Sequence, residues 1–287
     1  MDWEGTSLEH SNLERVKQFK SDWDIPFVHF YNPAYYTDPG HAKININKKV
    51  KRVFSKDDEI GLHLHTPRHL LWAANLSPRI GPCFSHYGDF NPGVYNGQEV
   101  MLLAYSKHEL KELINYSLEK LNKNGFKNIN SFRAGGWMSD EKVWEALIET
   151  GLPIESSATN SKFLDGSSWE GDNIQRYISL LWGDIQINTR PYYLQTYSGQ
   201  IFEIPNNLGA IDYWNDPLIQ RQIDQICAEY NTYEKLLLVI NSHQETFKEH
   251  SNKLEYFLGQ LEYHFGKNKI QYTTNKEIYS QELMNCA

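Results

Sequence analysis

Histidines concentrate in one short stretch of the sequence, E-I-G-L-H-L-H-T-P-R-H, which runs from position 59 to 69. His63 and His65 would lie on one face of a strand, because side chains two residues apart point to the same side. His65 and His69 would converge instead if a helical turn begins at Thr66. Imidazole is a common ligand of zinc and other transition metals. The cluster therefore predicts a metal site at the end of a strand.

Two carboxylates stand near the beginning of the sequence, where Asp2 and Glu4 are separated by one residue in D-W-E-G. In an extended chain both would point to the same side and converge on one spot. Such a pair can divide two tasks, one carboxylate binding a metal and the other accepting a proton. Taken by itself, however, this short motif is more typical of a frayed acidic terminus.

Arg133 and His243 each come at or after the end of a run that is typical of a strand. Arg133 lies in S-F-R-A-G-G-W, and its planar guanidinium can hold a carboxylate through two parallel hydrogen bonds. A surface arginine beside an ordinary turn is the alternative. His243 follows the apolar run Leu236–Ile240, and histidine is suited to donating a proton near neutral pH. A capping or packing histidine fits that position equally well.

The elements that must position these residues alternate along the chain. Short apolar runs predict strands of a parallel sheet that is buried on both faces. Helix signals lie between them: a capping box at Ser106, a start at Ser139 with an end at Gly151, a start at Asp216 and an apolar stripe at 254–265. The alternation predicts an α/β fold with its chemistry at the carboxyl ends of the strands. The expected strands are 25–31, 59–65, 129–133, 152–156, 178–182, 201–205, 235–241 and 269–273.

Composition is that of an ordinary globular protein. The 287 residues carry a formal net charge of −8, which argues against binding to nucleic-acid phosphates. The purest apolar run, Leu236–Ile240, has five residues, whereas a membrane-spanning helix needs about 20. The polar first residues lack the pattern of a signal peptide, and the three cysteines form no C-x-x-C motif. We therefore expect a cytoplasmic protein with no transmembrane segment and no nucleic-acid partner.

Two further features concern the surface. Aromatic residues make up 14 % of the chain, which is compatible with a groove that takes a sugar ring, although a core and a tyrosine-rich surface also account for it. Residues 75–104 are rich in Gly, Pro, Asn and aromatics and predict a long excursion over one rim of the fold.

In order along the chain, the motifs D-x-E-G, E-I-G-L-H-L-H-T-P-R-H, S-F-R-A-G-G-W and N-S-H-Q-E resemble those of the polysaccharide deacetylase family, the NodB-type group or carbohydrate esterase family 4. The resemblance runs from residue 2 to about residue 245. It implies an irregular (β/α) barrel of about seven mostly parallel strands, as a single domain over residues 1–287. Family members have a full apolar strand before the acidic pair, where this sequence has only Met1, so we expect a truncated first strand or a start codon placed too late.

The resemblance also implies a metal site. Glu4 matches the family's carboxylate ligand, and a histidine pair supplies two further ligands. The usual family motif, H-[S/T]-x-x-H, matches His65 and His69. The H-x-H motif of a similar branch of the family matches His63 and His65. The resemblance leaves this register open, and it implies a divalent metal, zinc, as the cofactor.

The same resemblance implies that Asp2 is the catalytic base, that Arg133 orients it and that His243 is the general acid. The expected function is a metal-dependent hydrolase that removes an acetyl group from an N-acetylated sugar or a surface-polysaccharide precursor. One alternative is another hydrolase on the same barrel, acting on a small amide or on a glycosidic bond with Glu203 and Asp212 as its carboxylates. The other is a non-catalytic barrel that binds glycans.

Overall fold

The computed structural model describes residues 1–85, 96–233 and 235–285. The main sheet has the strand order β1-β2-β3-β4-β5-β7-β6, and β8 pairs with β9 in a second sheet. Within both sheets every pairing is parallel except that of β6 with β7. The expected mostly parallel α/β fold is therefore confirmed. The strands are β1 Asp2–Trp3, β2 Val28–Tyr31, β3 Glu59–Leu64, β4 Ser131–Ala134, β5 Ile154–Glu155, β6 Tyr192–Thr196, β7 Gly199–Glu203, β8 Gly209–Ala210 and β9 Ile240–Asn241.

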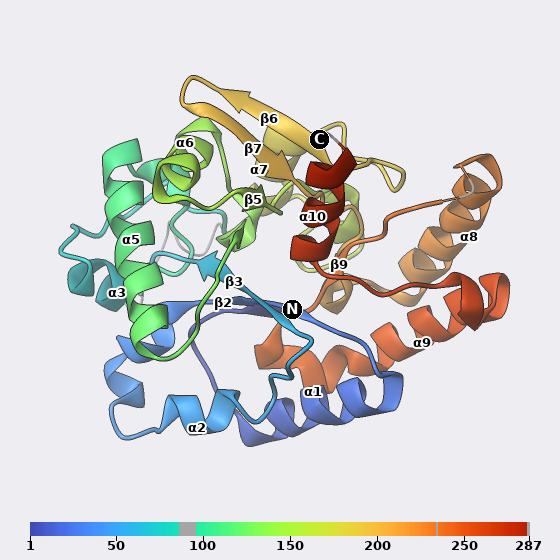
Figure 1. Ribbon diagram of the computed structural model, residues 1–287, viewed down its shortest axis with the longest axis horizontal. Coiled ribbons are helices and arrows are strands. Elements are labelled where there is room, and N and C mark those ends of the chain that lie inside the picture. Colours follow the sequence, from blue (N-terminus) through green and yellow to red (C-terminus); the bar gives the residue numbers. More distant parts are fainter. Residues whose placement is uncertain (86–95, 234, 286–287) are drawn as a thin grey trace.

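The strands are arranged like those of an irregular barrel (Figure 1). Isolated bridges between Asp2 and His243, and between Thr159 and Asn206, connect the main sheet to the β8–β9 pair. The ladders of the described residues do not form a continuous closed circle. Strand β1 spans two residues.

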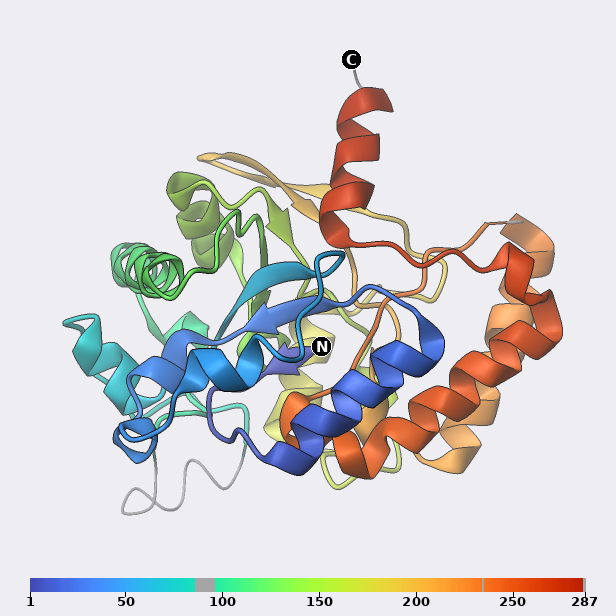
Figure 2. The same ribbon diagram turned by 60° about the horizontal axis from the view of Figure 1, so that its bottom comes forward.

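Helices surround the strands. Figures 1 and 2 show α1 and α9 side by side along one flank, with α8 next to α9, and the N-terminus near the middle of the molecule. Helix α10 extends from the opposite end of the structure in Figure 2. None of the helices in the described ranges is long and apolar enough to cross a membrane. The helices are α1 His10–Trp23, α2 Ile46–Val50, α3 Arg68–Ala73, α5 Lys107–Lys123, α6 Glu141–Thr150, α7 Asn173–Trp182, α8 Asp216–Tyr233, α9 Phe247–Phe265 and α10 Asn275–Asn285.

Local sequence signals account for most helix ends. The capping box before α5 is formed, because the Ser106 side chain accepts from the backbone of Glu109 and the Glu109 side chain accepts from the backbone of Ser106. Helix α6 begins slightly later than expected, because Asp140 rather than Ser139 caps its first turn. It ends at Gly151, whose φ of 80° suits glycine.

Two of the expected strands are wrong. Residues 178–182 belong to helix α7, in which Ile174, Ile178 and Trp182 recur every four residues and form a buried face. A five-residue apolar run cannot distinguish a strand from one turn of a buried helix, whereas this longer period can. Residues 269–273 follow a short 3₁₀ turn and form no ladder with the described strands.

The expected rim excursion at 75–104 lies partly outside the described residues, since 86–95 are not among them. Its final part returns to the barrel. Cys83 and Val100 form an isolated antiparallel bridge, and the Thr66 hydroxyl donates to the carbonyls of Gly97 and Val100. These contacts bring Gln98 to the end of β3.

Candidate functional site

Strand β1 lies between β2 and the chain that follows β9. Asp2 pairs with Phe30 and Trp3 with Tyr31, while the Asp2 N–H donates to Ser242 O at 2.9 Å. The Trp3 ring is fully buried, and its indole Nε1 donates to His29 Nδ1 at 3.0 Å. Because neighbouring side chains of a strand point to opposite faces, burying Trp3 turns Asp2 and Glu4 to the other side.

Glu4, His63 and His65 form a group that could hold a metal ion, and it corresponds to one of the two histidine registers that the sequence left open. Their ligand atoms all lie within 4.8 Å of one another. His63 Nε2 is 3.3 Å from Glu4 Oε1, and His65 Nε2 is 2.6 Å from Glu4 Oε2. The two rings lie on the same side of β3 and its end, with centroids 5.0 Å apart. The arrangement uses the H-x-H pair of the two alternatives.

The hydrogen bonds behind the two rings test whether this group suits a metal. His63 Nδ1 lies 2.9 Å from Arg133 O, and His65 Nδ1 lies 2.8 Å from Gln98 O. A carbonyl oxygen can only accept, so both Nδ1 atoms carry the hydrogen and both neutral rings present the Nε2 lone pair to Glu4. Lone pairs that face a carboxylate are favourable only with a positive charge between them, which a metal ion or a proton on the ring supplies. This arrangement, with each ligand ring fixed through its other nitrogen, is typical of metal centres.

Electrostatics in the group point the same way. Burial favours the neutral form of Glu4, but the neighbouring His65 and His63 outweigh it and hold the Glu4 pKa well below its usual value. Burial likewise opposes a charged His65, yet the Glu4 carboxylate raises the pKa of that ring. The site thus favours a negative carboxylate beside a positive charge, whether the charge is a proton or a metal ion.

Gly135 makes room for the His65 ring. A Cβ at this position would lie 2.5 Å from His65 Nδ1 and Cε1, far closer than any real contact. Gly135 immediately follows β4, so the ring packs directly against the backbone at the end of that strand. The glycine noted in S-F-R-A-G-G-W therefore has a packing reason beyond a flexible turn.

His69 is not brought into the group. It lies in helix α3, and its Nδ1 is 2.8 Å from the Thr37 hydroxyl. The ring is partly exposed, and burial lowers its pKa. The turn after β3 thus carries His69 towards Thr37 and away from Glu4.

Asp2 is held by two side chains. Arg133 Nη1 lies 3.0 Å from Asp2 Oδ1, and Asn241 Nδ2 donates to Oδ2 at 2.9 Å. Arg133 does not grip Asp2 through two bonds, since its Nε and Nη2 donate to the backbone and hydroxyl oxygens of Ser156. Burial raises the pKa of Asp2, but the charge of Arg133, together with the smaller contributions of His63 and His243, outweighs it, and the net shift is downward. Asp2 is therefore an ionised, firmly oriented carboxylate.

His243 has a partner that the sequence did not reveal in this role. Its Nδ1 lies 2.7 Å from Asp212 Oδ2, and its Nε2 lies 3.7 Å from Glu4 Oε1. Burial disfavours the charged ring, but the hydrogen bond and charge of Asp212, together with Glu4 and Asp2, raise the pKa of His243 to about 10. Because β8 and β9 pair side by side, residues just beyond their ends become neighbours. Sequence spacing gives no signal for that pairing.

Glu203, the other carboxylate considered for a glycosidic bond, faces a different environment. It accepts from Ala158 N at 2.9 Å and lies beside Glu155, and both glutamates are fully buried. Burial and the neighbouring Glu155 raise the pKa of Glu203 well above its usual value. Glu203 is not among the residues that line the cavity around Asp212, so the structure does not present these two as a flanking pair.

The metal-ligating group opens into a cavity of about 770 Å³, which is within the range of small-molecule sites. Asp2 and His243 line it together with the three ligating side chains. Five aromatic residues form much of the remaining wall: Phe84, Trp137, Trp169, Tyr213 and Trp214. The cavity lies at the carboxyl ends of the strands, where the α/β fold was expected to place its chemistry.

No protein-family model matches the chain, and no curated protein matches it by sequence. Solved structures do resemble it in fold. One is a Mycobacterium smegmatis protein assigned as a polysaccharide deacetylase, with a TM-score of 0.54, 12 % identity and coverage of 95 % of this chain and 77 % of that one. Another is 4-alpha-glucanotransferase from Thermococcus litoralis, with a TM-score of 0.52 and 12 % identity, covering 94 % of this chain and 36 % of that one. At this identity, the similarity establishes a shared fold.

Proposed function

We propose that the protein is a metal-dependent hydrolase that removes an acetyl group from an N-acetylated sugar. The observation that carries the proposal is the convergence of two imidazole lone pairs and the Glu4 carboxylate beside two separately held groups, Asp2 and His243. The fold similarity to a protein assigned as a polysaccharide deacetylase supports the reaction class. The aromatic wall of the cavity supports a sugar, because flat rings pack well against pyranose faces.

Glu4, His63 and His65 would hold the metal, and two nitrogens with one carboxylate oxygen are donors that suit zinc. A metal held there would polarise a carbonyl oxygen and make water acidic enough to act as a nucleophile near neutral pH.

Asp2 accepts the proton of the attacking water. It is ionised because Arg133 lowers its pKa, and Asn241 fixes its second oxygen. Arg133 stays in place because Ser156 binds its other two N–H groups. Because Ser156 fixes the guanidinium, Arg133 can both stabilise the negative charge of Asp2 and hold its carboxylate in one orientation.

His243 donates a proton to the departing amine. Its Nδ1–H is committed to Asp212, so the Nε2–H is the proton available on the cavity side. The raised pKa of His243 keeps the ring protonated at neutral pH, which is the form an acid requires. Asp2 and His243 thus perform opposite proton transfers because opposite charges surround them.

The test compares two histidine variants in the same seven-residue cluster. His65→Ala removes a metal ligand, whereas His69→Ala removes a ring that contacts Thr37 and serves as the matched control. Protein purified without chelator is analysed for metal content and for acetate release from N-acetylated oligosaccharides. We expect the wild type and His69→Ala to carry about one metal per chain and to be active, and His65→Ala to lose both properties. A wild type that neither holds nor responds to zinc, cobalt, nickel or iron would refute the proposal.

A further inference from the structure

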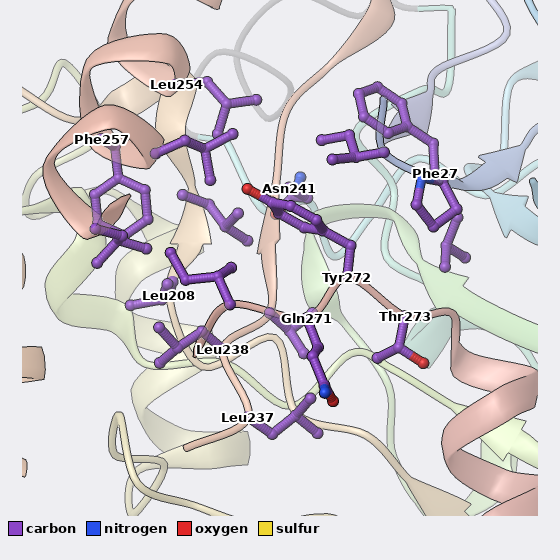
Figure 3. A pocket seen from close by; sticks show the side chains of 18 of the residues that line it. Phe27, Leu208, Leu237, Leu238, Asn241, Leu254, Phe257, Gln271, Tyr272 and Thr273 are labelled. Atoms are coloured by element: carbon purple, nitrogen blue, oxygen red, sulfur yellow. The ribbon is translucent and has the colours of Figure 1, made fainter. Parts of the chain in front are cut away.

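A second cavity, of about 360 Å³, lies at the amino ends of the strands, away from the candidate site. Most of its wall comes from four parts of the chain: 25–28 before and within β2, Leu236–Ile240 leading into β9, helix α9, and 269–273 before α10. Figure 3 shows Tyr272 between Phe27 on one side and Leu254 and Phe257 on the other. The volume is more than twice that of an engineered apolar cavity of about 150 Å³ that binds benzene.

The wall is unusually apolar for a space that is not filled by the protein. Leu236–Ile240, the purest apolar run of the sequence, lines it, and every residue of that run remains partly exposed. Leu254, Phe257 and other apolar residues of α9 line it as well. Leaving the side chains of 236–240 partly uncovered forgoes burial worth about 25 cal/mol for each Å² of apolar surface. An apolar ligand would recover that energy.

A few polar groups at the wall have unused hydrogen-bonding capacity. Tyr272 Oη and Asn275 Nδ2 are buried and have no hydrogen-bond partner among the described residues. Both groups can donate, which selects a ligand whose polar end accepts.

We propose that this cavity binds a single-chain amphiphile: an alkyl chain of roughly eight to twelve carbons with a carboxylate or similar acceptor as its head. The alkyl chain lies against Leu236–Ile240 and α9, and the head accepts from Tyr272 and Asn275. Few polar groups converging in an otherwise apolar cavity are typical of small-molecule sites. The inference stands independently of the proposed acetyl-group hydrolysis.

Two residues connect this cavity to the candidate site. Arg133 and Asn241 line the cavity and also hold the two oxygens of Asp2. A molecule bound here would lie behind the side chains that orient the proposed base.

The experiment measures binding of decanoate to the 287-residue protein by titration calorimetry. We expect one equivalent to bind, and decyltrimethylammonium, which has the same chain and the opposite charge, to bind at least tenfold more weakly. Leu238→Trp would fill the cavity and weaken decanoate binding at least tenfold. Leu180→Trp is the matched control, because Leu180 is 80 % exposed and does not line the cavity.

A second variant keeps the test decisive if Leu238→Trp does not fold. Tyr272→Phe removes one hydroxyl from the cavity and should weaken decanoate binding about 2- to 10-fold, the loss expected for one hydrogen bond. The proposal is overturned if decanoate does not bind the wild type, or if the cation binds as tightly as decanoate. It is equally overturned if folded Leu238→Trp, or Tyr272→Phe, binds decanoate as the wild type does.

Discussion

Asp212 binds His243 twice through one oxygen. The Oδ2 atom accepts from the His243 backbone N–H and lies 2.7 Å from the ring Nδ1, while Oδ1 accepts from the Ser242 hydroxyl. The backbone contact fixes where His243 lies, and the ring contact fixes which nitrogen faces the cavity. One buried carboxylate therefore sets both the position and the protonation of the proposed acid.

Replacing Asp212 with asparagine should make the His243 ring hold its proton less tightly. The pKa of His243, now raised to about 10, should fall towards 6.5 because the largest favourable contribution is removed. We expect the alkaline limb of kcat to move to lower pH, with turnover at pH 8 reduced about 30-fold, because only about one ring in 30 stays protonated at 1.5 pH units above a pKa of 6.5. The pH profile of acetate release measures this. Asp216→Asn, on the same cavity wall, is the control, and an unshifted alkaline limb in Asp212→Asn would exclude this role.

Gly135→Ala should disturb the metal centre without touching a ligand. The new Cβ would collide with the His65 ring and displace it from Glu4, so metal affinity should fall about 10- to 100-fold. The crowding should also cost about 1–3 kcal/mol of unfolding free energy. Zinc titration and thermal unfolding measure the two effects.

Gly259→Ala provides the control for this substitution. Gly259 lies within helix α9, and an added Cβ would meet nothing within 4 Å. Alanine there should leave zinc affinity unchanged and stabilise the helix by about 0.5–1 kcal/mol. Equal zinc affinity in Gly135→Ala and Gly259→Ala would mean that the His65 ring tolerates displacement.

Asp2→Asn should separate turnover from metal binding. The substitution removes the proposed base and leaves Glu4, His63 and His65 in place, so zinc should be retained while acetate release collapses. It also leaves the Arg133 charge buried without its counter-charge, which should lower the unfolding free energy by about 3–5 kcal/mol. Metal content, turnover and urea unfolding are measured on one preparation. Full activity in Asp2→Asn would place the base elsewhere.

Because of His29, the free energy of unfolding should decrease as the pH is lowered. Burial lowers the pKa of His29 to about 4, below the value of 6.5 for an unfolded histidine. Between those values the unfolded chain takes up a proton that the folded one refuses, so His29 makes folding less favourable as pH falls from 6.5 to 4. From pH 7 to pH 4.5 this amounts to about 2 kcal/mol.

Urea unfolding of wild type and His29→Gln at both pH values isolates that contribution. Glutamine does not titrate, so the loss of stability between pH 7 and 4.5 should be smaller by about 2 kcal/mol in the variant. Asp58, whose pKa His29 helps to lower, also changes in the variant, but the groups that do not contact His29 titrate equally in both proteins and cancel. If both proteins lose the same stability, His29 is not the group that responds.

The sequence predicted those parts of the site that depend on local geometry. His63 and His65 converge because alternate strand residues share a face, and the ends of α5 and α6 follow from their capping residues. His69 was one of the candidate ligands, and its actual direction could not be predicted because it depends on the turn after Thr66, which tertiary contacts to Gly97 and Val100 set.

Pairs of residues that come together only in the folded chain could not be predicted from the sequence. Asp212 reaches His243 because β8 and β9 are adjacent, and Gln98 reaches His65 because the 75–104 excursion returns to β3. We expected Arg133 to bind a carboxylate through two hydrogen bonds. Its Nε and Nη2 donate instead to Ser156, which follows the neighbouring strand β5. Periodicity and spacing describe single elements, and these contacts arise between elements.

The position of β1 has a consequence for folding during synthesis on the ribosome. The backbone N–H of Asp2 is paired with Ser242, that of Glu4 with Glu245, and the Asp2 carboxylate with Asn241. Residues 2–4 therefore gain these contacts only after residues 241–245 have been synthesised. A nascent chain that has not yet exposed residue 245 contains Glu4, His63 and His65 but lacks the contacts that complete the alignment of β1.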